Sequence, residues 1–113
     1  MKKFMVLYMA SASDFEKMKK NSTPAQQKKD MDAWMKWMND NKSSIVDGGA
    51  PLGKTKRVSS SGVSDIKNEV GGYSIVQAKS HDAATKLFGK DHPFLQMPGV
   101  RIEIVEIMPM AGM

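Results

Sequence analysis

The stretch 100-VRIEIVEIM-108 decides the fold class of this chain. Aliphatic residues, most of them β-branched, alternate with charged residues over its first half, which is the two-residue period of a β-strand. It is the strongest strand pattern in the sequence. A single strand leaves its backbone groups unpaired, so the rest of the chain must supply partner strands.

Three other stretches have the composition of strands. Residues 3–9 form a short apolar run, residues 54–59 alternate weakly, and residues 71–78 begin with a glycine pair and are entered through a turn. Residues 63–68 are polar and predict a connection between the second and third strands.

Two helices are predicted between these strands. Thr23, Pro24 and Gln26 form a capping-box pattern that begins a helix ending near Asn41. Its apolar stripe recurs at three- and four-residue spacing and consists of Met31, Trp34, Met35 and Met38. Ser80 caps a second helix through about residue 89, whereas residues 11–22 predict only a helical turn around residues 15–18.

The resulting order is βαββαβ in a single domain, residues 1–113. This order predicts an α+β, ferredoxin-like fold with a four-stranded antiparallel sheet and two helices on one face. The other face is left bare. A wet face should alternate with polar residues, yet the first and last strands are apolar on both faces. We therefore predict a homodimer in which two sheets pack face to face, as a dimeric α+β barrel.

The glycine-rich stretch 45-IVDGGAPLG-53 is the best candidate for the wall of a ligand site. Its glycines allow sharp turns and a close approach of the backbone to a ligand. Asp47 is the only carboxylate in it.

Composition narrows the functional class. The chain has no cysteine, which excludes thiol nucleophiles, disulfides and thiolate metal sites. Its two histidines lack ligand spacing, so neither a metal nor another cofactor is predicted. The net charge of +5 is spread among acidic residues, and stacking aromatics are scarce, so a nucleic-acid partner is not expected. Without a stretch of membrane-spanning length, the expected location is the cytoplasm.

Several segments together resemble the YCII-related family, and most of all its DGPF-domain branch. They are 4-FMVLY-8, 31-MDAWMKWM-38, 46-VDGGAPL-52, 71-GGYSI-75 and 105-VEIMPM-110, in this order along nearly the whole chain. The resemblance implies a dimeric α+β barrel of mostly unassigned function, with some members proposed to be small-molecule enzymes.

Two departures from the family pattern concern its chemistry. The region of the DGPF motif reads 64-SDIKNEV-70 here. The histidine near the first helix that YCII-type proteins carry, a proposed general acid/base, is replaced by 23-TPAQ-26, and Gln26 does not exchange protons near neutral pH.

Asp47 and His92 are the candidate catalytic residues, each with a structural alternative. A buried Asp47 would act as a base or orient a ligand, whereas an Asx-turn to Gly48 and Gly49 would make it structural. His92 follows Asp91, whose carboxylate would fix its tautomer, or it is a surface histidine before the turn proline Pro93.

The candidate ligand-binding residues are Tyr8, Trp37, Gly48, Gly49 and Tyr73. Two functions follow from these predictions. One is a homodimeric protein that binds a small molecule in a cavity beside the sheet and could act on it as a small-molecule enzyme. The alternative is a non-catalytic homodimeric protein-interaction module whose pocket is closed by methionine side chains.

Overall fold

The computed structural model describes residues 1–109. Its main sheet contains β1 (Lys2–Met9), β2 (Ile45–Pro51), β5 (Val70–Ala78) and β6 (Arg101–Glu106) in the order β2-β5-β1-β6, with every neighbouring pair antiparallel. The helices are α1 (Ala12–Asn21), α2 (Pro24–Asp40) and α3 (His81–Thr85), with a 3₁₀ turn η1 at Pro93–Gln96. The predicted α+β fold, a ferredoxin-like antiparallel sheet with helices, is confirmed.

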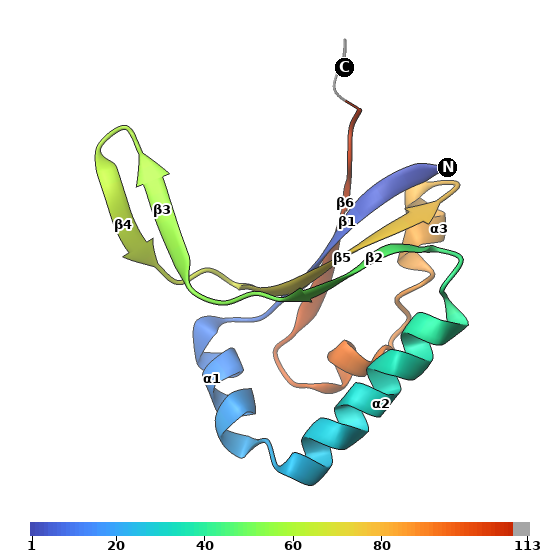
Figure 1. The fold of residues 1–113 in the computed structure, drawn as a ribbon, viewed down its shortest axis with the longest axis horizontal. Coiled ribbons are helices and arrows are strands. Elements are labelled where there is room, and N and C mark those ends of the chain that lie inside the picture. The colour runs from blue at the N-terminus through green and yellow to red at the C-terminus, as the bar shows by residue number, and fades with distance from the viewer. Residues whose placement is uncertain (110–113) are drawn as a thin grey trace.

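The core lies between the sheet and the helices. From Phe4 along β1 and from Gly72 along β5, the even-numbered residues are buried and their odd-numbered neighbours are not, as the pleat of a strand requires. The buried cluster combines these two strands with the segments that follow β5, and its members are Phe4, Val6, Tyr8, Val76, Ala78, Ala84, Phe88 and Phe94. In Figure 1, α1 and α2 lie on one side of the sheet.

The second strand of the main sheet consists of other residues than those predicted. The glycine-rich stretch predicted to be a loop forms β2. Its pairing with β5 shifts register twice, between Ile45 and Asp47 and between Asp47 and Ala50. Gly49 has φ +74, and a Cβ there would overlap the Tyr73 carbonyl oxygen. Gly49 therefore allows the bulge in β2, because only glycine fits this conformation and this close contact.

The predicted strand 54–59 exists but lies outside the main sheet. It is β3 (Thr55–Ser59), and it pairs with β4 (Gly62–Ile66), which replaces the predicted polar connection. The hairpin forms a separate two-stranded sheet that projects from the domain on the side opposite α1 and α2 (Figure 1).

The helices differ from their predictions mainly in length. The Thr23 side chain accepts a hydrogen bond from the Gln26 amide, which confirms the predicted start of α2. Residues 12–21 form a complete helix α1, capped by Ser11 and without a buried residue. The helix predicted from Ser80 to about residue 89 ends as α-helix at Thr85. No helix within residues 1–109 is long and apolar enough to cross a membrane.

Candidate functional site

Tyr8 on β1 points into the core between sheet and helices. It follows Phe4 and Val6 on the inward face of the strand and is 4% exposed. Burial raises the pKa of its phenol to about 12, against a smaller opposing effect of its hydrogen bond to Ser74. The phenol therefore stays protonated at neutral pH.

A chain of hydrogen bonds links Tyr8 to the glycine-rich strand. The Ser74 hydroxyl on β5 donates to the Gly48 carbonyl over 3.0 Å, and it lies 3.0 Å from the Tyr8 hydroxyl. Because Ser74 has one proton and gives it to Gly48, the Tyr8 hydroxyl donates to Ser74. This chain pairs the buried hydroxyls of Tyr8 and Ser74 with the partly buried Gly48 carbonyl and fixes the direction of the Tyr8 ring.

His92 begins the η1 turn, where Pro93 occupies the first helical position. Its Nδ1 accepts a hydrogen bond of 3.1 Å from the Phe94 amide, so its side chain caps this turn. The predicted alternative of a surface histidine before a proline is wrong, because His92 is only 3% exposed.

Four aromatic rings surround His92, and we call them the aromatic box: Tyr8, Trp34, Trp37 and Phe88. Their centroids lie 5.8, 4.9, 4.6 and 5.3 Å from that of the imidazole, in the same order. Tyr8 is stacked on the imidazole, whereas the two tryptophans approach edge to face. The Trp37 indole N–H donates to the Leu87 carbonyl over 3.0 Å, which fixes this wall of the box.

The imidazole is neutral and has an unused donor. Burial lowers the pKa of His92 to about 4, because the box does not solvate a charge. Since Nδ1 accepts from Phe94, the neutral tautomer carries its proton on Nε2. Within residues 1–109 this Nε2 is buried and has no hydrogen-bond partner. Such a group is costly to leave unpaired, so its retention calls for an explanation.

These properties define the chemistry that the box supports. A neutral N–H in an apolar enclosure binds an acceptor such as a carbonyl oxygen and polarises it. A histidine with a pKa of about 4 is unprotonated near pH 7, so it does not act there as a general acid through an imidazolium.

The other predicted site residues lie apart from His92 or have structural partners. The Asp47 carboxylate is exposed and accepts from the Gly49 amide over 2.8 Å, as in the Asx-turn alternative. Gly48 is covered by the Met38 methyl group, which a Cβ there would meet at 2.6 Å. Tyr73 is paired with Leu7 on the face of the sheet opposite Tyr8. The structure thus brings together Tyr8, Trp37 and His92, with the Gly48 carbonyl at the end of the hydrogen-bond chain.

Two hollows open elsewhere on the surface. The larger, of about 840 Å³, lies between α1 and the base of the β3–β4 hairpin and is lined in part by Phe15, Lys54 and Asn68. The smaller, of about 420 Å³, runs along β6 and includes Phe88, one wall of the aromatic box. The chemistry of the box, rather than the size of either hollow, identifies the candidate site.

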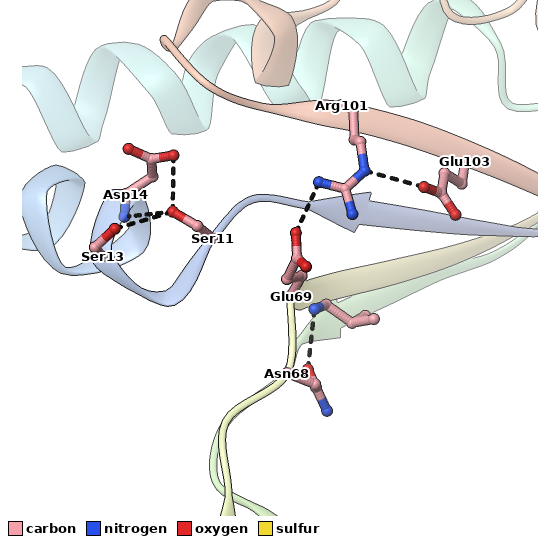
Figure 2. A network of polar contacts seen from close by, with 8 residues as sticks. Ser11, Ser13, Asp14, Asn68, Glu69, Arg101 and Glu103 are labelled. Atoms are coloured by element: carbon pink, nitrogen blue, oxygen red, sulfur yellow. Dashed lines mark hydrogen bonds and ion pairs between the residues drawn. The ribbon is translucent and has the colours of Figure 1, made fainter.

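A second polar cluster lies at the edge of the sheet (Figure 2). Arg101 on β6 pairs with Glu69 over 2.9 Å and with Glu103 over 3.0 Å. Next to it, the Asn68 side chain accepts from the Val70 amide, and Ser11 caps α1 through the Asp14 amide. Each of these groups has a partner, and the Arg101–Glu69 pair links the base of the hairpin to β6. No group of three metal-ligating side chains occurs within the described residues.

Comparison with known proteins adds little to this site. No family model matches the chain, and no curated protein matches it. A structural match covers 89% of this chain and 90% of 5-chloro-2-hydroxyhydroquinone dehydrochlorinase from Burkholderia phenoliruptrix, solved in complex with 2,5-dihydroxybenzoquinone. The sequence identity is 17% and the TM-score 0.47. Function must therefore be argued from the geometry of this chain.

Three residues of the site were not predicted from the sequence to be functional: Trp34, Ser74 and Phe88. Ser74 carried a usable signal, because the alternation of β5 places it inward between apolar neighbours, where a hydroxyl needs a partner. Trp34 and Phe88 belonged to helical apolar patterns, which predict core packing without revealing the ring that they surround.

Proposed function

We propose that this protein is a homodimeric, YCII-related protein that binds a small planar molecule carrying a hydrogen-bond acceptor in the aromatic box. The observation that carries the proposal is the buried, unpartnered Nε2–H of His92. A ligand acceptor would satisfy this donor, and aromatic rings favour a planar partner through stacking and edge-to-face contact.

Helix α2 gives the ligand a route into the box. It has no buried residue, and within the core it contributes only the partly buried rings of Trp34 and Trp37. Entry beneath α2 therefore displaces two side chains rather than a packed layer. The hydrogen bond gained by His92 and the apolar surface buried by the ligand would offset the lost Trp37–Leu87 bond and the displaced ring contacts.

Of the two predicted catalytic residues, only His92 belongs to the proposed site. Its role is to hold and polarise a carbonyl or similar acceptor while remaining neutral. Tyr8 forms the floor of the site, since its hydroxyl is committed to Ser74 and its high pKa keeps the proton in place. Asp47 supports β2 through Gly49.

The homodimer is supported by the surface that the chain exposes. A compact protein of 12.5 kDa exposes about 6,200 Å². This chain exposes 8387 Å², or about 2,200 Å² more than the scaling predicts. The bare face of the sheet presents apolar side chains in adjacent strands, with Met5 between Ile75 and Val105 in register. Pairing two such faces would remove them from water.

The alternative, a non-catalytic interaction module, is favoured by one observation. The Met38 methyl group lies against Gly48, so a methionine side chain covers the glycine-rich strand that was predicted to line the ligand site. In this alternative the unpaired His92 is a structural defect that the protein tolerates, and no small molecule enters.

Native mass spectrometry with 4-hydroxyacetophenone, a planar carbonyl probe, tests the proposal. We expect a dimer of about 25 kDa, twice the chain mass, that carries the probe. His92→Phe keeps the ring volume but removes the donor, so we expect its probe affinity to fall about tenfold. The matched control is His81→Phe, which changes the other histidine, an exposed one.

Two results would contradict the proposal separately. A monomeric protein would contradict the proposed dimer. The ligand site would be contradicted if wild type and His92→Phe bound the same amount of probe, or if neither bound it. Trp34 and Trp37 are the only tryptophans in the chain, so quenching of intrinsic fluorescence reports occupancy of the box independently.

A further inference from the structure

The β3–β4 hairpin, residues 55–66, projects from the main sheet, and we call it the arm (Figure 1). Its five residue pairs form a sheet of their own. A two-stranded hairpin is marginally stable in water unless it packs on something else. A second surface is therefore needed to explain an ordered arm.

The arm ends in a polar turn, residues 59–62, and an exposed apolar pair lies next to this turn. Val58 and Val63 are cross-strand partners beside the turn, and they are 78% and 66% exposed. β-Branched pairs of this kind stabilise sheets when they are covered. Two large exposed valines next to one turn are instead typical of a contact surface.

The base of the arm is held firmly, which sets its direction. Glu69 pairs with Arg101 on β6 (Figure 2). The Glu69 carbonyl also accepts from the Ala10 amide over 2.9 Å. Asn68 donates to Thr55 across the base, and Lys67 pairs with Glu16 on α1. A projecting element with a braced base is preorganised for a partner rather than loosely attached.

The arm rises on the bare side of the main sheet, opposite α1 and α2 (Figure 1). This is the side that the proposed homodimer covers. Four strands about 4.8 Å apart and about 20 Å long give a footprint of only about 400 Å². A stable dimer buries about 800 Å² of accessible surface per partner. The arm lies on the same side as the bare face, so an arm that reaches the partner adds to the area of this contact.

We propose that the arm packs against a second copy of this chain, so that each protomer of the dimer is held by the arm of the other. This inference rests on the proposed homodimer and extends it. It assigns the hairpin an interface function that the sheet-to-sheet contact alone does not include.

Analytical ultracentrifugation of the full chain tests the arm through the Kd of the dimer. The double variant Val58→Thr, Val63→Thr keeps β-branched residues in the strands and makes the pair polar. We expect it to raise the Kd about 100-fold. In a two-fold dimer each substitution occurs in both protomers, so the apolar contacts of both arms are lost. The control Ser61→Thr makes a comparable change in the turn and should leave the Kd within about threefold.

A site-specific dye gives a second readout, because the chain contains no cysteine. An environment-sensitive dye on Val58→Cys should shift to the blue in the dimer and lose this shift on dilution. Val105→Lys, on the bare sheet face, should abolish both the dimer and the shift.

The outcomes separate the arm from the dimer. A monomeric wild type overturns both proposals. A wild-type dimer whose Kd is unchanged by the double variant, with a dye that reports water at every concentration, overturns the arm alone. A dimer weakened equally by Ser61→Thr also overturns it, since the effect then does not come from the valine pair.

Discussion

The two faces of the same sheet have similar residues and opposite surroundings. On the helix side, Phe4, Val6 and Val76 are completely buried in an aromatic and aliphatic core. On the other side, Met5 and Ile75 are paired in register but remain partly exposed. Strand alternation decides which residue belongs to which face, whereas the identity of the residues does not. An apolar residue in a strand therefore predicts a covered face without saying what covers it.

The comparison also explains where polar groups are found. The helix side holds the buried hydroxyls of Tyr8 and Ser74 and the imidazole of His92, each at a defined distance from its neighbours. The bare side has its ion pairs at the margin, where Arg101 joins Glu69 and Glu103. The first arrangement suits a ligand site, and the second suits the rim of an interface.

The largest expected effect comes from truncating one residue on each face. Phe4→Ala should lower the free energy of unfolding by about 3–5 kcal/mol, because it leaves a cavity in a closed core. Met5→Ala should cost about 1–2 kcal/mol in dilute protein, because Met5 is already partly exposed there. Urea unfolding followed by circular dichroism measures both changes.

Protein concentration sharpens this comparison. A dimer that covers Met5 makes the cost of Met5→Ala rise with concentration, because the folded chain is then linked to assembly. The difference between wild type and Met5→Ala should therefore widen between about 1 and about 100 µM. A constant difference over this range would show that the bare face stays in water.

The strands that alternate, or that are apolar throughout, were predictable from the sequence, and so was the start of α2. β1, β5 and β6 lie within about two residues of their predicted positions, because a local pattern and the sheet agree there. β2 was missed because Gly48 and Gly49 signal a turn locally, whereas in the fold Gly49 forms a bulge against Tyr73. α1 was missed because a polar, surface helix without buried residues has no clear apolar stripe.

The site was predictable only residue by residue. The sequence identified Tyr8, Trp37 and His92 one by one as candidate site residues. That they meet depends on contacts between residues 55 and 84 positions apart in the sequence. Tyr73 was also predicted to bind the ligand, but it lies away from the site. It is one residue from Ser74, yet the pleat places it on the opposite face from Tyr8.

The pH dependence of stability should show the burial of His92. Its pKa is about 4 in the folded protein and 6.5 in the unfolded chain, so the unfolded chain binds more protons between these values. The contribution of the neutral imidazole is fully present above pH 6.5 and is lost as pH falls toward 4. The loss amounts to about 3 kcal/mol over this window.

Urea unfolding of three proteins between pH 4 and 7 isolates this effect. The free energy of unfolding of His92→Phe should change less with pH than that of the wild type. The variant His81→Phe should follow the wild type, because the His81 side chain is exposed. Parallel profiles for the wild type and His92→Phe would mean that the imidazole gains no proton on unfolding, and the aromatic box would then have to admit water.

The smallest effect distinguishes the two faces of β5. Ser74→Ala removes the link between the Tyr8 hydroxyl and the Gly48 carbonyl. It leaves the buried Tyr8 hydroxyl unpaired and takes one bond from the partly buried carbonyl, so it should cost about 2 kcal/mol. Tyr8→Phe should cost about 1 kcal/mol, because Ser74 still donates to Gly48. On the other face, Gln77→Ala loses an exposed bond to the Ser43 carbonyl and should cost under about 0.5 kcal/mol. A double-mutant cycle of Tyr8→Phe and Ser74→Ala should give a smaller cost than the sum, and strict additivity would show that the hydroxyls act independently.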